Sequence, residues 1–256
     1  MPENNLTSEQ RKQNIIDTRG DWENEHVIEF RDDKSRNHKR KSWKIDIDHL
    51  FLRKNNGRIT SDTRTWEKLK GPIDENSNEG QKILRDMIYK KDKTTFDTLS
   101  SLIQAHGQEQ PAVCLADGTL LNGNRRLAVI KSLYEENRDA KYKTMECVVL
   151  PTGNPDDGYG HGAAPTKSEI ADLEYAYQMR RSGFSEYTGL NKAFMYKRGI
   201  EQGRELSEMI AKNPTLNVEG ITKRKFDNVV KKEKAEYLDT LESFEEYLAY
   251  FGREGI

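Results

Sequence analysis

The sequence predicts an α+β protein in which a small sheet with helices precedes a mainly helical region. Two short apolar runs within residues 111–121 flank Asp117-Gly118, a dipeptide typical of a hairpin turn. From Leu127 onward, apolar residues recur at helical spacing. Residues 151–165 are rich in Gly and Pro, and helical spacing resumes after them. We therefore predict a sheet domain at 43–150, a hinge at 151–165 and a helical domain at 166–256.

Residues 1–42 form a predicted polar N-terminal extension. Its apolar spacing favours a helix near residues 8–21, and the run 26–30 favours a strand or a partner-binding segment. A basic cluster follows, for which a solvated arm and a nucleic-acid contact are the two alternatives. The cluster consists of Arg31, Lys34, Arg36, Lys39, Arg40 and Lys41.

The sheet domain is predicted to alternate strands and helices. Residues 60–95 form a polar insertion whose apolar residues have helical spacing. A helix is expected from Phe96 to Gly107, where the glycine ends it. The hairpin then leads directly into the next helix.

The turn between the hairpin and that helix has the chemistry of a phosphate-binding site. Gly123 allows a positive φ or a close approach of the backbone to a ligand. The first turn of a helix leaves N–H groups unpaired, and their partial positive charge favours an anion. A guanidinium from Arg125 or Arg126 can hold phosphate oxygens in a bidentate manner. One turn would thus supply both dipole and charge.

A fixed order of parts surrounds this turn. A helix ends at Gly107, Gln110-Pro111 opens a strand, and a hairpin leads into Gly123-Asn124-Arg125-Arg126. This order resembles the N-terminal domain of the ParB/sulfiredoxin superfamily, whose motif is Gly-x-Arg-Arg or Gly-x-His-Arg. Residues 44–50 and 55–59 are similar to the opening strand and the Asn/Arg loop of that family. The resemblance covers about residues 43–150 and implies a small mixed sheet with helices.

The resemblance implies that a nucleotide, CTP or ATP with Mg²⁺, binds at this turn. Sulfiredoxins carry a reactive cysteine directly after the motif glycine, and Asn124 occupies that position here, which excludes the sulfiredoxin reaction. The identity of the base does not carry over. The residues implied to bind the nucleotide are Gly123, Asn124, Arg125, Arg126, Gln110, Asn56 and Arg58.

Other motifs for chemistry are sparse. Cys114 and Cys147 lie in apolar runs and are predicted to be small buried side chains. The five histidines lie in separate segments, and neither a Walker-type phosphate loop nor a Gly-x-Ser-x-Gly elbow is present. If the protein transfers phosphoryl groups, an acid near the turn must serve as base or metal ligand. The candidates are Asp117, Asp46, Asp48 and Glu174.

The first helix after the hinge is similar, loosely, to a Glu-Asn-x-x-Arg-like element of partition proteins. In that role Glu174 could reach a nucleotide-bound magnesium ion, and Arg180 or Arg181 a phosphate. The alternative is an exposed amphipathic helix face.

A DNA-binding element is predicted within residues 206–234. Residues 206–213 suit a first helix and residues 222–232 a basic recognition helix, although the link of 213–221 is longer than in a helix-turn-helix. Two alternatives are a solvated face and pairing with the acidic stretch 236–246. The predicted DNA contacts are Lys223, Arg224, Lys225, Lys231 and Lys232.

The helix expected at 236–251 carries an apolar stripe that could form a homodimer or close the core of its own chain. The net charge of −1 means that any nucleic-acid contact comes from a local patch. No run of apolar residues is long enough to span a membrane, so we expect no membrane partner and a cytoplasmic protein.

The leading hypothesis is a ParB-like nucleotide-binding protein that couples its nucleotide state to DNA or partner binding. The alternatives are an NTP-dependent enzyme on the same fold, such as a small-molecule kinase, an NTPase or a nuclease, and an interaction module that binds no nucleotide.

Overall fold

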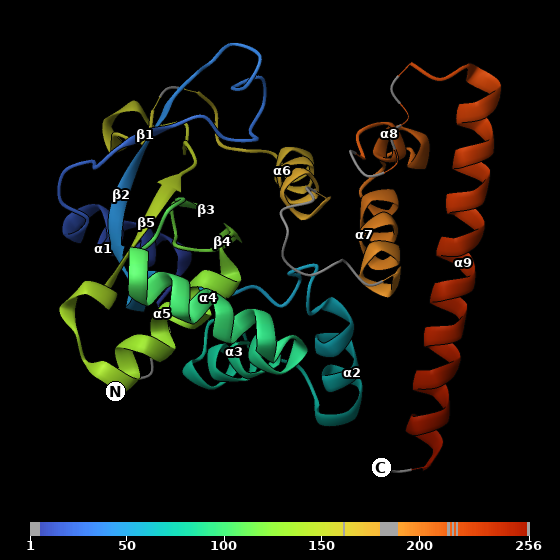
Figure 1. Cartoon of the computed structure of the whole chain (residues 1–256), viewed down its shortest axis with the longest axis horizontal. Coiled ribbons are helices and arrows are strands. Elements are labelled where there is room, and N and C mark those ends of the chain that lie inside the picture. The colour runs from blue at the N-terminus through green and yellow to red at the C-terminus, as the bar shows by residue number, and fades with distance from the viewer. Residues whose placement is uncertain are drawn as a thin grey trace. The chain divides into compact units, whose positions relative to one another are not determined.

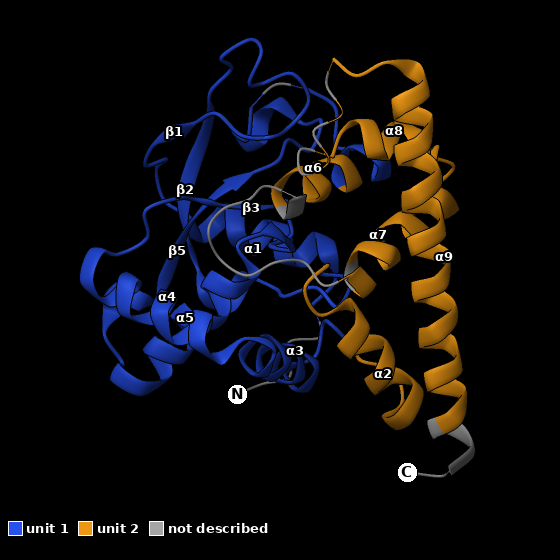
Figure 2. Cartoon of the chain, turned by 45° about the vertical axis from the view of Figure 1, so that its right-hand side comes forward, with its two compact units in different colours: residues 1–56, 74–170 blue, residues 57–73, 171–256 orange. Residues whose placement is uncertain are grey.

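The computed structural model describes residues 6–160, 162–179, 189–213, 216, 218 and 220–254. Over these residues the protein is α+β, which confirms the predicted class (Figure 1). The chain divides into two compact units: residues 1–56 with 74–170, and residues 57–73 with 171–256 (Figure 2).

The first unit contains a mixed sheet of five strands in the order β1-β2-β5-β3-β4. The strands are β1 (Glu25–His26), β2 (Arg40–Asp46), β3 (Ala112–Cys114), β4 (Leu120–Asn122) and β5 (Thr144–Val149). Neighbouring strands are antiparallel except β3 and β5, which are parallel with Val113 opposite Val148. The central strand β5 is apolar and nearly fully buried, as expected of a strand with a neighbour on each side.

The predicted hairpin is present between β3 and β4. Gly118 takes a φ of +82°, and a Cβ there would lie 1.9 Å from the His49 carbonyl oxygen, so only glycine fits this turn. The turn is closed by the Leu115 N–H, which donates to the Thr119 carbonyl oxygen at 2.9 Å. The sequence signal at Asp117-Gly118 therefore reflects a steric requirement of the fold.

Helices α3 (Asn78–Lys91), α4 (Lys93–His106) and α5 (Asn124–Asn137) pack together beside this sheet (Figure 1), while α1 (Ser8–Thr18) packs against β2. Short 3₁₀ turns are η1 (Ile47–His49), η2 (Ala140–Tyr142) and η3 (Pro155–Asp157). The apolar residues Leu127, Ile130, Leu120 and Val148 of α5 and the sheet are each buried. Residues 1–42, predicted to be an extension, belong to this compact unit.

The second unit is helical. It comprises α2 (Thr60–Lys70), α6 (Lys167–Met179), which straddles the boundary between the units, α7 (Gly189–Glu201), α8 (Leu206–Ala211) and α9 (Lys223–Glu254). Tyr175, Met195, Tyr196, Met209 and Ile210 form its buried core. Figure 2 shows α9 as the longest element of this unit, and α2, α7 and α8 all contact it.

The structural division differs from the predicted one in two places. The boundary near the hinge falls after Ile170 rather than within 151–165, and residues 57–73 belong to the helical unit instead of the sheet domain. The reason for the second difference is packing: α2 contacts α7 and α9, and the Arg64 guanidinium lies over the Phe194 ring at 4.3 Å. Among the described residues, no helix combines the length and the apolarity that crossing a membrane requires.

Candidate functional site

The turn into α5 has the backbone geometry that the sequence predicted. Gly123 is the N-cap of α5, with φ +99° and ψ 8°. As a glycine, the N-cap residue has no side chain with which to cap the helix, and the first turn carries no acidic residue. A Cβ at Gly123 would lie 2.7 Å from the Ala112 Cβ and 3.2 Å from the Met145 Cε. Glycine is therefore required both by the positive φ and by the contact with β3 and β5.

The residues after Gly123 are tied to the protein around them. Asn124 is 8% exposed, and its Oδ1 accepts a hydrogen bond from the Arg53 N–H, with 3.4 Å between the nitrogen and the oxygen. The Arg126 guanidinium donates to the Gln110 carbonyl oxygen, so the structure brings together two of the predicted site residues. The first contact ties the turn to the segment at Arg53, and the second ties it to the segment that opens the strand at 111.

Arg125 lies close to Asp92, an acid that is not among the predicted site residues. Its Nη2 is 4.0 Å from the Asp92 Oδ2, and its side chain is 12% exposed. Asp92 is the N-cap of α4, where its carboxylate accepts from the Thr95 N–H at 3.0 Å. The sequence signal that could have found it is an Asp directly before the Lys-Thr-Thr start of a helix. A ligand phosphate at Arg125 would therefore share the guanidinium with Asp92.

The remaining predicted nucleotide contacts lie in different units. Asn56 is buried in the first unit, and its N–H donates to the Arg53 carbonyl oxygen at 3.2 Å. Arg58 belongs to the second unit, as does Glu174. Arg180 and Arg181 lie outside the described residues.

Glu174, the predicted magnesium ligand, is buried in an ion pair. Its Oε2 lies 2.5 Å from the Arg198 Nη2, and its side chain is 3% exposed. Burial without such a partner would be costly, so Arg198 explains why a carboxylate is accommodated on this face of α6. To bind a metal ion, Glu174 would have to share or release this guanidinium. Among the described residues, no three His, Cys, Asp or Glu side chains form a group that could hold a metal ion.

The other candidate acids are engaged in ion pairs of the first unit. Burial tends to raise the pKa of Asp117, but hydrogen bonds from Thr119, Ser8 and Arg11 outweigh it, and the pKa is lowered. Asp46 and Asp48 share the Lys143 ammonium, at 3.1 and 2.5 Å. All three carboxylates thus have a structural partner.

Both cysteines are buried and free, as their apolar surroundings predicted. They lie on the neighbouring strands β3 and β5. A hydrogen bond with Cys147 and burial both raise the pKa of the Cys114 thiol. A buried thiol that stays protonated is a poor nucleophile.

The predicted basic helix is the start of α9, which continues without a break through the acidic stretch. Phe226, Val229 and Val230 pack on the core of the unit, which turns the cations of residues 223–234 outward. Lys223, Arg224, Lys225, Lys231 and Lys232 are all exposed, and none pairs with an acid of the described residues. The structure thus leaves a basic surface on the first three turns of α9.

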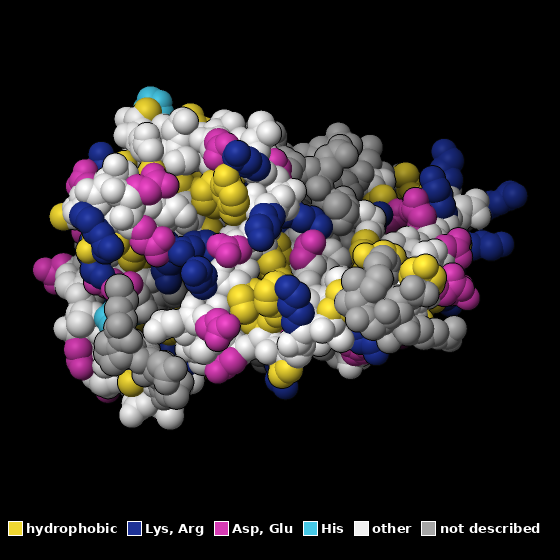
Figure 3. All heavy atoms as spheres, turned by 90° about the horizontal axis from the view of Figure 1, so that it is seen from below, with side chains coloured by type: hydrophobic (Ala, Val, Ile, Leu, Met, Phe, Trp, Pro, Cys, Tyr) yellow, Lys and Arg dark blue, Asp and Glu magenta, His cyan; other side chains and the backbone are white. Residues whose placement is uncertain are grey.

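The apolar stripe predicted at 236–251 faces the core of its own unit. The Phe244 and Phe194 rings meet edge to face with centroids 5.1 Å apart, and Leu241 is 7% exposed. Leu238, which the prediction also counted in this stripe, is instead 49% exposed. Over the face shown in Figure 3, cations and anions are interspersed, in keeping with the net charge of −1.

Comparison of the chain with protein-family models, with curated proteins and with solved structures gave no match.

Proposed function

We propose that the protein binds a nucleoside triphosphate, CTP or ATP with Mg²⁺, at the N-terminus of α5 and couples that state to DNA or partner binding through its helical unit. The observation that carries the proposal is the turn at Gly123. A glycine with positive φ is followed directly by a helix of 14 residues that carries two arginines in its first turn. This combination suits a phosphate, because one turn would supply both N–H groups and guanidinium groups.

The residues fit the phosphate part of a nucleotide better than its metal ion. Gly123 and the N–H groups of the first turn of α5 would meet phosphate oxygens, and Arg125 and Arg126 would neutralise their charge. Mg²⁺ on a nucleotide commonly takes one or two carboxylates from the protein. Glu174, the ligand that the sequence predicts, belongs to the second unit, where Arg198 engages its carboxylate.

Nucleotide binding and DNA or partner binding would be coupled by thermodynamic linkage. A nucleotide that binds one conformation of the protein more tightly than another shifts the population by that difference in affinity. The basic surface of α9 is the part of the helical unit suited to DNA, because its cations are exposed and directed away from the core. A coupling protein of this kind would act in the cytoplasm. A homodimer is compatible with the proposal, with exposed residues such as Leu238 available to a second copy.

A second candidate, an interaction module without nucleotide, is favoured by the contacts of the two arginines. Arg125 lies beside Asp92, and Arg126 donates to the Gln110 carbonyl oxygen. Both contacts would hold α4, α5 and β3 together without any ligand. In that case the arginines would serve the fold alone.

The deciding experiment is calorimetric titration with CTP, ATP and GTP in the presence of Mg²⁺. We expect one nucleotide to bind the wild type, and the double variant Arg125→Ala/Arg126→Ala to lose at least about 100-fold in affinity, since two charge-assisted contacts are removed. The control is Lys82→Ala/Lys90→Ala, which removes two exposed cations from α3. A thermal melt of each variant shows whether the fold survives.

The outcomes separate the candidates. Nucleotide binding by the double variant at the level of the wild type would refute the assignment of the turn. Absence of binding to any nucleotide would favour the interaction module. Multiple turnovers of the bound nucleotide, lost on removal of one carboxylate while binding persists, would identify an enzyme instead.

DNA binding is tested by its dependence on salt. If the start of α9 contacts phosphates, the triple variant Lys223→Gln/Arg224→Gln/Lys225→Gln should reduce the slope of log K against log salt by about 3, because each lost phosphate contact accounts for about 0.9. The measurement is fluorescence anisotropy with a labelled duplex at several salt concentrations. An unchanged slope would exclude this surface as the DNA contact.

A further inference from the structure

The connection between β1 and β2, residues 27–39, folds as an ordered loop instead of the solvated arm that the sequence allowed. Phe30 is 1% exposed and anchors it, with the guanidinium groups of Arg31 and Arg40 over its ring at 4.6 and 4.8 Å. Arg40 and Asp33 form an ion pair whose side chains are 6% and 2% exposed. The second hydrogen bond of this pair, from the Arg40 Nη2 to the Asp33 Oδ1, measures 2.8 Å. A bidentate pair so deeply buried fixes the loop in one conformation.

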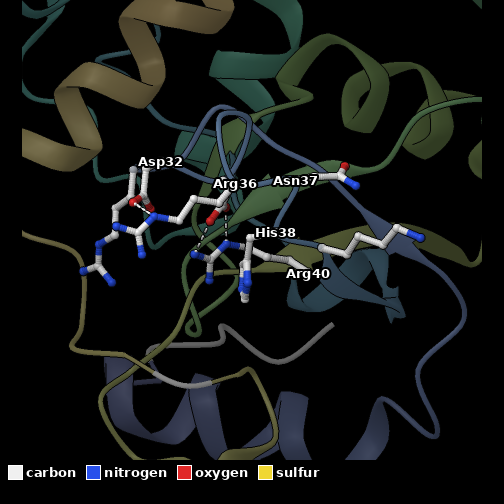
Figure 4. Close-up of a pocket in the computed structure, with 8 residues that line it drawn as sticks. Asp32, Arg36, Asn37, His38 and Arg40 are labelled. Atoms are coloured by element: carbon white, nitrogen blue, oxygen red, sulfur yellow. Dashed lines mark hydrogen bonds and ion pairs between the residues drawn. The ribbon is translucent and has the colours of Figure 1, made fainter.

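The ordered loop lines an open surface hollow of about 550 Å³. Figure 4 shows the side chains of Arg36, His38 and Arg40 on one side of the loop, with Asn37 pointing away from them. Four cations and two carboxylates line the hollow, so positive charge prevails. The charged lining residues are Arg31, Arg36, Lys39, Arg40, Asp32 and Asp33.

These cations differ in how firmly they are engaged. Arg40 is committed to Asp33 within the fold, and Arg31 to Glu169, whose Oε1 lies 2.6 Å from the Arg31 Nε. The pair between Arg36 and Asp32 is instead exposed, with side chains 76% and 50% accessible, so its net strength is small and it can be exchanged.

Two further donors beside Arg36 are unengaged. Lys39 and His38 are exposed, and neither takes part in an ion pair with the described residues. An ammonium group, an imidazole N–H and an exchangeable guanidinium therefore border the same hollow. The buried pair beneath them keeps the loop in place whether or not they bind anything.

We propose that this hollow is a binding site for a phosphate group, held by Arg36, Lys39 and His38. The planar guanidinium fork matches two phosphate oxygens, and the ammonium supplies a third contact as a point charge. One phosphate or diphosphate group suits the site better than a long polyanion, because a single short loop supplies all the contacts and the Asp32 carboxylate borders them. The site uses none of the residues of the α5 turn and stands independently of the proposed nucleotide function.

The test is an NMR titration of the full-length ¹⁵N-labelled protein with pyrophosphate, inorganic phosphate and 5′-AMP, at constant ionic strength set with NaCl. We expect saturable shifts of the amides of residues 36–40. In Arg36→Gln/Lys39→Gln the affinity should fall at least about tenfold, since two charge-assisted contacts are lost. Asp33 and Arg40 remain in this variant, so an unchanged thermal midpoint is expected.

The control is Lys41→Gln/Lys44→Gln, which removes the same charge from exposed positions of β2 outside the hollow. Its affinity should stay within about twofold of the wild type, because neither side chain borders the proposed site. Shifts that follow ionic strength alone, or an equal loss in both variants, would overturn the proposal.

Arg125→Ala/Arg126→Ala should leave the shifts of the loop intact, which separates this site from the proposed nucleotide site. The three ligands then identify the source of the phosphate. Binding of 5′-AMP as tight as that of inorganic phosphate would support a nucleotide-borne group, and tighter binding of pyrophosphate would support a free diphosphate.

Discussion

Replacement of Gly123 by Ala tests whether the fold itself requires glycine at the start of α5, because the measurement needs no ligand. The new methyl group would be placed 2.7 Å from the Ala112 Cβ and 3.3 Å from the Ala112 Cα. It would also force an L-residue to hold a φ of +99°. Both effects act on the folded state, in the segment where β4 turns into α5.

The expected loss is a few kcal/mol. A left-handed conformation costs an L-residue about 1–2 kcal/mol, and overpacking a tight contact costs about 1–3 kcal/mol. Alanine also restricts the unfolded chain more than glycine does, which offsets up to about 1 kcal/mol of this loss. We therefore expect Gly123→Ala to lower the free energy of unfolding of the first unit by about 2–4 kcal/mol.

Gly20→Ala is the matched control, because Gly20 also has a positive φ of +66° but no atom lies within 4 Å of the added Cβ. It should cost no more than about 1 kcal/mol. Hydrogen exchange of the β3 and β5 amides measures the first unit directly. Exchange should be faster by about 30-fold to several hundred-fold in Gly123→Ala. Equal effects of the two substitutions would show that Ala112 yields to the methyl group, and would refute the steric argument.

Two further predictions concern ion pairs of the first unit. Asp33→Asn should lower the free energy of unfolding, measured by urea denaturation, by about 3 kcal/mol or more, because it leaves the buried Arg40 without its carboxylate. Asp32→Asn, at an exposed ion pair, is the control and should cost under about 0.5 kcal/mol. Equal costs for the two substitutions would contradict the structural role of the buried pair. The hydrogen bond from Arg31 lowers the pKa of Glu169 to about 2 from an ordinary 4.5, so its contribution to stability is complete above about pH 4.5 and is lost as the pH falls toward 2. The thermal midpoints of the wild type and of Glu169→Gln should accordingly converge at acid pH, and a constant difference between them would count against this pair.

Local signals predicted the part of the fold that depends on local geometry. The hairpin at Asp117-Gly118 and the turn at Gly123 are present because their glycines satisfy positive φ angles and close contacts that no other residue can. The helix ending at Gly107 is present for a related reason, since its φ is +75°. The α+β class followed from the same signals.

Long-range pairing could not be predicted in the same way. The charge reversal between residues 223–234 and 236–246 suggested separate segments, yet α9 is continuous because Phe226, Val230, Tyr237 and Leu241 keep one apolar face along it. Residues 31–41 favour a solvated arm or a nucleic-acid contact in the sequence because they are basic. The sequence does not reveal that Asp33 is buried against Arg40 and orders the loop. For the candidate site, the backbone turn was predictable and the neighbours of the two arginines were not, since Asp92 and Gln110 reach them through the tertiary fold.

The membership of α2 in the helical unit has a consequence for biosynthesis. Residues 57–73 leave the ribosome well before their packing partners, since α7 begins at residue 189 and α9 at residue 223. The sheet unit, complete by residue 170, can form first, while α2 has to wait for these partners. A fragment that ends in the Gly- and Pro-rich segment would keep α2 without these partners. Division of this protein into independently folding pieces therefore requires the removal of residues 57–73 as well as a cut after residue 170.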